Sequence, residues 1–444
     1  MIDSTGGRQL SAAHIVPTRR QVLLGGMGAA SAALLAACGG VTGNSSKGSG
    51  GSGKGTLQAL FMQQAGYSTD DVDEMLSRFH GANPDITVKP TFVAYEALHN
   101  KIVTAAAAGA YDVVLIDVIW PAEFATTSII ADVSSRFPGD WETAMLGGAL
   151  ATAEYQDKYY GVGWGMDTKF FYHNTEMLKR AGVSPSQLGT WAGVLDAARA
   201  LKSKGVVRYP LAWSWSQAEA LMCDYTQLLG AFGGTFLDDG GKLAINTGGA
   251  VTALEWMRQS IVDGLTNPAS TTFLEADVQK TMNDGQAAMC LNWTYYLATS
   301  KDAAQSKVVG QIDVAQTPAG PSGLRPGVNG AMALAISSGS KNQDAAWKLI
   351  QHLTSEAELD RYASSALPIW KASYAKPDVV GSAPQTFAAA KAQLDDMILR
   401  PGVANYNAIS QAIQVELQNA LLGKKSAQQA LDDAVQTATP LLKS

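Results

Sequence analysis

Residues 159–174 read Y-Y-G-V-G-W-G-M-D-T-K-F-F-Y-H-N, and this stretch decides the fold. Its first half carries three alternating glycines, too many for an ordinary strand interior. Glycine in a strand usually marks a bend or a close approach by another segment or a ligand. The second half is aromatic and typical of a strand. The stretch therefore predicts a β-strand that crosses from one body of the protein to another and exposes Trp164 and Asp167 at the crossing.

The spacing of Trp164 and Asp167 sets a condition on this prediction. Side chains alternate between the two faces of a strand, so residues an odd number apart point in opposite directions. Both side chains can reach one ligand only if Gly165 breaks the alternation. If the strand is regular, we expect Asp167 rather than Trp164 to contact the ligand. A phosphate-binding loop is not predicted, because the lysine and the helix that complete such a loop are missing.

The composition indicates a globular protein with large cores. A chain of 444 residues is long enough for two or three domains, and its residues are 46% hydrophobic and 16% charged. The formal net charge of −6 and the lack of any basic run argue against nucleic acid or an anionic membrane surface as a partner. Ten tryptophans and fourteen tyrosines supply large rings for cores and for recognition surfaces.

The N-terminus carries a predicted export signal. Arg19 and Arg20 precede a weakly apolar run over residues 22–37, which is too short to span ~30 Å of hydrocarbon comfortably. Paired arginines before such a run predict a twin-arginine (Tat) signal peptide over residues 1–37. The sequence Leu-Ala-Ala-Cys-Gly around Cys38 resembles a lipobox, which implies lipid attachment (palmitate) at Cys38. The alternative is a buried helix with a chance cysteine.

Residues 38–55 are rich in glycine and serine and predict a flexible tether. Together with the signal, the tether predicts an exported lipoprotein held at the outer face of the bacterial cytoplasmic membrane, or a periplasmic protein. Beyond Cys38 the chain has only Cys223 and Cys290. An exported protein could pair them in a disulfide, but both have apolar surroundings, so buried free thiols are equally open.

The rest of the chain alternates between strand and helix patterns in two blocks. The first block has strands over 56–62, 86–93 and 111–117, with helices between them, which predicts a parallel sheet wrapped by helices. The second block begins after residue 174, and its predicted strands cover 209–213, 287–293 and 312–316. Its predicted helices cover 175–181, 191–204, 217–232, 247–262 and 275–283.

A loop dense in proline and glycine, residues 318–327, is a second candidate crossing. A strand over 331–336 and a helix over 342–353 follow it, and residues 382–443 are predicted to be almost wholly helical. Two blocks of α/β alternation separated by irregular segments predict two lobes with a cleft between them.

Five segments, in this order, carry a family resemblance. They are 111–117 with Trp120 and 129–133; Tyr160-Gly161 with Asp167-Thr168, Tyr172, Asn174, 181–183 and Thr190-Trp191; Met282 to Met289 with Asn292-Trp293; 318–321 with Gly330, 335–338, 341–342 and 345–347; and Leu367-Pro368 with Leu422-Gly423 and Ala430-Leu431. In this order, behind the lipobox and tether, they resemble the extracellular solute-binding proteins of ATP-driven sugar importers, the group that includes maltose-binding protein.

The resemblance implies a two-lobed α/β fold of the periplasmic-binding type, with a ligand cleft and a hinge. The chain would cross between the lobes three times. The implied first lobe comprises residues 56–162 and 320–366, and the second 163–319 and 367–444. Two departures from the family pattern bear on the ligand rather than the fold: Val162-Gly163-Trp164 replaces a segment with proline, and Tyr172-His173-Asn174 stands for Tyr-Tyr-Asn.

A sugar or polyol presents hydroxyl groups and weakly apolar C–H faces. Its site needs hydrogen-bond acceptors such as carboxylates and amides, together with aromatic plates. In α/β folds such groups gather at the ends of strands. The residues at these positions are Gln64, Asp117, Trp120, Trp164, Asp167, Trp213, Trp215, Asn292, Trp293, Tyr295 and Asn329.

Each candidate has a structural alternative. A single tryptophan can serve core packing, Asp167 can be a turn or cap residue, and Gln64 can be an ordinary surface residue. The placement of these residues favours a ligand-binding role over a purely structural one, because each aromatic and polar pair follows the end of a predicted strand.

We therefore expect a binding protein that captures a mono- or oligosaccharide or a sugar alcohol and delivers it to the membrane permease of an ABC importer. It would act as a monomer, without a cofactor or nucleic-acid partner. No metal site is predicted, because the five histidines are isolated. The main alternative is a secreted glycoside hydrolase with Asp117 and Asp167 as paired carboxylates. A binder of peptides or metal is a third.

Overall fold

The computed structural model describes residues 55–64 and 66–443. The predicted signal peptide, Cys38 and all of the tether but its last residue lie outside these ranges. Within them, no helix has the length and apolar character needed to cross a membrane.

The first lobe is built on a five-stranded sheet with the order β2-β1-β3-β11-β6. Strands β1, β2 and β3 run parallel, and β11 runs antiparallel to both of its neighbours, β3 and β6. Every residue of β3 is buried, as its continuous apolar run predicts. The strands are β1 (Gly55–Met62), β2 (Ile86–Val93), β3 (Val113–Asp117), β6 (Val162–Gly165) and β11 (Met332–Ile336).

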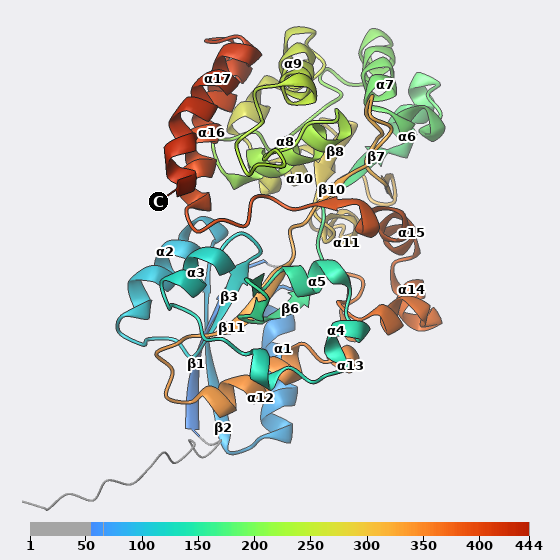
Figure 1. Ribbon diagram of the computed structural model, residues 1–444. Helices are drawn as coiled ribbons and strands as arrows, with labels where there is room; N and C mark the ends of the chain where they lie inside the picture. The colour runs from blue at the N-terminus through green and yellow to red at the C-terminus, as the bar shows by residue number, and fades with distance from the viewer. Residues whose placement is uncertain (1–54, 65, 444) are drawn as a thin grey trace, which may run out of the picture. The chain divides into compact units, whose positions relative to one another are not determined.

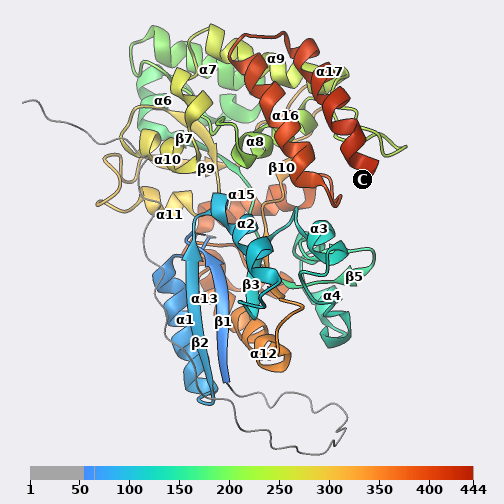
Figure 2. The same cartoon turned by 90° about the vertical axis from the view of Figure 1, so that its left-hand side faces the viewer.

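Helices cover this sheet, and short elements surround it (Figures 1 and 2). Helix α1 begins behind Ser68, whose side chain caps it in a capping box, and it packs against α12. The helices are α1 (Thr69–Ala82), α2 (Tyr95–Ala106), α3 (Pro121–Thr126), α4 (Trp141–Ala144), α5 (Gly147–Ala151), α12 (Gln343–Leu353), α13 (Glu356–Arg361) and α14 (Pro377–Ser382), with a hairpin of β4 (Glu154–Tyr155) and β5 (Lys158–Tyr159).

The second lobe is built on a three-stranded antiparallel sheet with β7 in the middle. Its strands are β7 (Phe170–Asn174), β8 (Met289–Asn292) and β9 (Ile312–Ala315). Its helices are α6 (Thr175–Ala181), α7 (Trp191–Ser203), α8 (Glu219–Ala231), α9 (Gly248–Val262), α10 (Glu275–Asn283), α11 (Tyr296–Ser300), α15 (Pro384–Gln393), α16 (Tyr406–Leu421) and α17 (Ala427–Ala438). The two-lobed α/β fold is thus confirmed.

The stretch 159–174 gives one strand to each sheet, β6 to the first and β7 to the second. In the pairing of β6 with β11, Gly163 lies opposite Ala333 and Gly165 lies opposite the adjacent Met332. Trp164 is therefore an extra residue, and this bulge breaks the alternation of side chains just before Gly165. Trp164 is nevertheless buried in the core of the first lobe, where its indole donates to Leu353 O at 3.1 Å, so its predicted exposure at the crossing was wrong.

Two predicted elements differ from the structure. Residues 209–213 form no regular strand, since only Leu211 makes isolated bridges, to Thr266 and to Met289. Residues 382–443 are not one helical region, because Leu394–Asn405 separates α15 from α16. This interruption holds strand β12 (Met397–Ile398), paired in parallel with β10 (Gly327–Val328), and Pro401-Gly402 stops any helix there.

The predicted change from the first lobe to the second at residue 367 does not agree with the hydrogen bonds that the following residues form. Ile369 O accepts a hydrogen bond from Leu146 N at 2.9 Å, and the Trp370 indole donates to Thr354 O at 2.8 Å. Both partners belong to the first lobe. Thr317 N donates to Gln393 Oε1 at 2.8 Å, which ties α15 to the second lobe. We therefore propose that the third crossing lies between residues 376 and 384.

Candidate functional site

A cavity of about 710 Å³ lies between the two lobes. The ends of strands and helices from both lobes form its walls, as expected for a site in an open α/β fold. Seven of the predicted site residues line it: Gln64, Asp117, Trp120, Trp164, Asp167, Trp293 and Tyr295.

The other four predicted residues do not line the cavity. Trp213 and Trp215 are buried in the second lobe with their rings stacked at 5.6 Å, so their role is core packing. Asn292 accepts from Trp293 N at 2.8 Å, and Asn329 accepts from Ala331 N at 2.9 Å. These two amides hold the loops beside the cavity. Sequence position at a strand end does not distinguish these inward residues from the cavity-facing ones.

Asp167 is anchored through one oxygen. Its Oδ1 accepts from Thr294 N at 3.0 Å, from Thr294 Oγ1 at 2.6 Å and from Thr168 N at 2.9 Å. Within the described ranges, Oδ2 has no hydrogen bond to the protein and remains available at the cavity. Burial raises the pKa of Asp167 to about 6, although the hydrogen bonds from Thr294 and Thr168 oppose the rise.

Trp293 and Tyr295 are half-buried aromatic plates in the loop after β8. The indole Nε1 of Trp293 donates to Glu275 Oε1 at 3.2 Å. A Cβ added at Gly330 would lie 2.2 Å from the Trp293 ring, so only glycine fits there. The ring is therefore fixed from one edge by Glu275 and from one side by Gly330.

A buried ammonium group supports this plate from behind. Lys169 Nζ lies 5.1 Å from the Trp293 ring centroid and forms ion pairs with Asp224 at 2.7 Å and Glu275 at 3.1 Å. Its side chain is fully buried. Burial favours the neutral amine, but the two carboxylates outweigh burial and raise the pKa of Lys169 above its ordinary value. Lys169 stays charged and holds Glu275 in place.

The first lobe contributes a second aromatic pair. The rings of Tyr95 and Trp120 stack at 5.9 Å with an angle of 18° between their planes. The Tyr95 hydroxyl donates to Asp117 Oδ2 at 3.0 Å, and Ile119 N donates to Asp117 Oδ1 at 3.2 Å. Trp164, by contrast, packs its ring against Tyr67 at 4.7 Å and belongs to the cavity wall.

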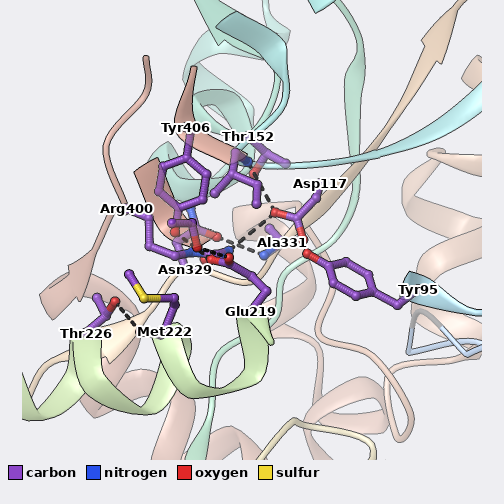
Figure 3. A network of polar contacts seen from close by, with 12 residues as sticks. Tyr95, Asp117, Thr152, Glu219, Met222, Thr226, Asn329, Ala331, Arg400 and Tyr406 are labelled. Carbon is purple, nitrogen blue, oxygen red and sulfur yellow. Dashed lines mark hydrogen bonds and ion pairs between the residues drawn. The ribbon is translucent and has the colours of Figure 1, made fainter. Parts of the chain in front are cut away.

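Arg400 joins the two lobes at the cavity (Figure 3). Its fully buried guanidinium lies 3.3 Å from Asp117 Oδ1 of the first lobe and 2.7 Å from Glu219 Oε1 of the second. It also donates to Asn329 O at 3.2 Å. Tyr406 donates to the same Glu219 oxygen at 2.5 Å. Nε of Arg400 has no hydrogen-bond partner among the described residues.

The sequence interpretation missed Arg400 and Glu219. Arg400 precedes Pro401-Gly402, a helix-stopping pair that marks an irregular segment and was available as a signal. Glu219 opens α8, where a carboxylate is an ordinary first-turn residue, so the sequence gives no reason to single it out. Only the fold brings both residues to Asp117.

The two described cysteines are free and buried, which settles the open question of their pairing. Cys223 contributes to the cavity wall, and burial raises the pKa of its thiol to about 12. Across residues 55–64 and 66–443, no three or more histidine, cysteine, aspartate or glutamate side chains are grouped so that they could hold a metal ion.

The chain is similar to several known proteins. The maltose-bound MalE3 of T. maritima is 28% identical, with a TM-score of 0.80, and the match covers 87% of this chain and 100% of that one. A solute-binding protein from Thermotoga lettingae bound to α-D-tagatose has 23% identity and a TM-score of 0.79, with coverage of 87% and 99%. The second likeness supports the fold alone.

A probable ABC transporter-binding protein of Deinococcus radiodurans is 29% identical over 335 residues, which cover 71% of this chain and 76% of the relative. The model of the bacterial extracellular solute-binding proteins matches residues 50–359, well over half of the chain. The chain belongs to the bacterial extracellular solute-binding protein family.

Proposed function

We propose that this protein captures an uncharged carbohydrate, either a mono- or oligosaccharide or a sugar alcohol, and delivers it to the membrane permease of an ABC importer. The observation that carries the proposal is the cavity between the lobes, where aromatic plates lie beside carboxylates. The similarity to maltose-bound MalE3 supports it.

The lining suits the two surfaces of a sugar. The rings of Trp293 and Tyr295 offer apolar area to C–H faces. The free Oδ2 of Asp167 and the carboxylate of Glu275 offer acceptors to hydroxyl groups, in charge-assisted hydrogen bonds. Because these groups are already held by the protein, little ordering is needed when a ligand arrives.

The charges around the cavity favour a ligand without negative charge. Among the described residues, five carboxylates line it together with one guanidinium, that of Arg400; the carboxylates are those of Glu96, Asp117, Asp167, Glu219 and Glu275. Arg400 is already engaged with Asp117 and Glu219. A phosphorylated or acidic sugar would meet mainly like charges, which raises the energy of its bound state.

We propose no hydrolase activity for Asp117 and Asp167. Each oxygen of Asp117 accepts a hydrogen bond from the protein, and Asp167 Oδ1 is held by Thr294 and Thr168. A glycosidase needs two free carboxyl groups, an acid and a second group that acts as nucleophile or base, and Asp117 is not free for the second role although Asp167 Oδ2 is unengaged. The check is incubation with oligosaccharides under conditions of excess substrate, and release of product over many turnovers would refute the proposal.

A thermal-shift screen tests binding itself. Mono- and disaccharides, hexitols and glycerol phosphodiesters are the ligands to compare, and a ligand at 100 times its Kd should add ~2.7 kcal/mol to the free energy of unfolding. Asp167→Ala and Trp293→Ala should each abolish the shift without unfolding the protein. Asp196→Ala, on the exposed face of α7, is the matched control and should leave it unchanged.

The sequence before residue 55 supports a proposal on location. We propose export through the Tat pathway and a lipid anchor at Cys38, so that the monomeric binding protein stays beside its permease at the outer face of the cytoplasmic membrane. Replacing Cys38 by alanine in the full-length precursor should move the protein from the membrane fraction to the soluble fraction. Equal fractionation of both forms would contradict the anchor.

A further inference from the structure

We propose that His173 is an acid-sensitive switch in the second lobe. When its ring takes up a proton, the edge strand β9 separates from β7 and exposes the ring to solvent. The switch acts on the stability of the lobe and does not involve a ligand, so its test is independent of the proposed function.

The ring of His173 is buried without a hydrogen bond. The residue lies on β7, the middle strand of the second-lobe sheet, and its side chain is only 3% exposed. Both ring nitrogens, Nδ1 and Nε2, are buried, and neither has a hydrogen-bond partner among the described residues. Most buried polar groups in proteins do have such partners. An imidazolium ion here would be a buried charge without an acceptor for its two N–H groups, which is costly.

The neighbours of His173 on its own face of the sheet are mainly apolar. Met289 lies directly opposite on β8 and is fully buried. Phe171, two residues earlier on β7, shares the same face and packs against Trp191 with their ring centroids 6.0 Å apart. These side chains offer no acceptor to a charged ring, so the site favours the neutral form of His173.

One carboxylate faces His173, from the third strand of the sheet. Asp313 lies directly opposite on β9, and directly opposed side chains of antiparallel strands share one face. It is half-buried, and its Oδ1 accepts from Val314 N at 2.9 Å. Strand β8 carries no charged residue. Besides these strands, β7 contacts α6, and its Phe171 contacts α7. The charged residues of these two helices are all exposed: Glu176, Lys179, Arg180, Asp196, Arg199 and Lys202.

The environment of His173 makes the stability of the lobe depend on pH. Burial lowers the pKa of His173, and the carboxylate of Asp313 opposes this shift only in part. The unfolded chain takes up the proton at the ordinary histidine value of about 6.5, whereas the folded protein takes it up only at a lower pH. The stability that the neutral ring allows is therefore fully present above pH 6.5. It is lost as the pH falls through that value toward the lower value of the folded state.

Strand β9 is the element that opens. It lies at the edge of the three-stranded sheet and pairs with β7 over residues 312–315 (Figure 2). Proteins open locally where few contacts hold a segment, and an edge strand has one neighbouring strand instead of two. Opening of β9 exposes the ring of His173, which then takes up a proton from solvent. The protonated ring is disfavoured in the closed sheet, so acid increases the open population.

Urea unfolding of the mature protein at pH 7.5 and pH 5.0 tests the switch. His173→Leu replaces the ring by an apolar side chain, and His173→Gln keeps a polar side chain that does not titrate. Relative to either variant, the folding equilibrium constant of the native protein should fall at least about fivefold between the two pH values. Asp167 and Asp224 titrate in the same range with the opposite sign, because burial raises the pKa of each to about 6. Their effect is common to all three proteins and cancels in the comparison.

Two further variants separate titration from packing. Met289→Leu changes the packing beside the ring without changing a titrating group, so it should keep the native dependence on pH. Asp313→Asn removes the carboxylate that favours the charged ring. It should enlarge the loss of stability in acid when His173 is present and have no such effect in His173→Gln. An equal change with pH in the native protein and in both His173 variants would overturn the switch.

Hydrogen exchange locates the opening. Mass spectrometry of peptides that cover residues 310–317 measures the opening equilibrium of β9 at each pH, after correction for the intrinsic exchange rates. The opening constant of the native protein should rise at least about fivefold from pH 7.5 to pH 5.0, and that of His173→Gln should stay constant. The same opening constants in both proteins would show that β9 does not respond to His173 and would overturn the proposal.

Discussion

Asp167 shows how one side chain can serve structure and ligand at once. Its Oδ1 accepts hydrogen bonds from Thr294 and Thr168, while Oδ2 has no partner among the described residues and can accept a hydrogen bond from a ligand. The sequence indicated Asp167 by its place at the crossing, but it could not show which oxygen is free. That division depends on Thr294, which is far away in sequence and near only in the fold.

The raised pKa of Asp167 predicts a pH dependence of binding. Above pH 6 the group is an anion and accepts hydroxyl protons, and bound hydroxyls then hold its pKa lower in the complex than the value of about 6 in the free protein. Binding therefore releases a proton near this pH, and the Kd should rise as the pH falls below 6.

Calorimetric titrations between pH 5 and 8 measure this effect. The control is Asp167→Asn, which keeps the shape without a titrating group and should show a flat profile in this window. A native profile as flat as that of the variant would remove Asp167 from the ligand contacts.

At the scale of elements, most of the fold was accessible from periodicity. The continuous apolar run of β3 and the capping residue of α1 specify those elements locally. The prediction failed at residues 209–213, because these residues have a strand-like composition but form only the isolated bridges of Leu211. It failed again at 394–405, where tertiary pairing with β10 replaces helix. Both failures depend on partners distant in sequence.

Two glycines at the crossing strand β6, Gly161 and Gly165, should differ in how much an alanine substitution destabilises the protein. A Cβ at Gly161 would lie 2.6 Å from Leu334 O, whereas at Gly165 the nearest atom, the Tyr67 hydroxyl oxygen, would be 3.4 Å away. Gly161→Ala should therefore separate β6 from β11 and destabilise the protein by about 1–3 kcal/mol. Gly165→Ala should stay within about 1 kcal/mol of the native protein. Urea unfolding of both variants measures the difference, and equal stabilities would contradict the close packing at Gly161.

At the scale of the whole molecule, Arg400 connects what the sequence keeps apart. It lies 283 positions from Asp117 and 181 from Glu219 along the chain. Two lobes and a cleft were predictable, because the α/β alternation occurs twice around an irregular crossing. The ion bridge between the lobes was not, since it needs the relative placement of three segments.

Removing this buried cation should be costly. Arg400→Met leaves two buried carboxylates without their partner, and such losses typically cost about 3–5 kcal/mol. The matched control is Arg199→Met, whose ion pairs with Asp196 and Asp263 are solvent-exposed and typically worth about 0–1 kcal/mol. Urea unfolding without ligand compares the two. A loss in Arg400→Met no larger than that in the control would show that the bridge does not hold the lobes together.

The central claim is that the cavity between the lobes binds an uncharged carbohydrate. The most direct measurement is a calorimetric titration of the native protein and of Trp293→Ala with the carbohydrate that gives the largest thermal shift. The account predicts saturable binding by the native protein and at least a tenfold weaker Kd in the variant, because the variant lacks the plate that the C–H face covers. An identical Kd in both proteins, or no binding of any carbohydrate by the native protein, would contradict the account.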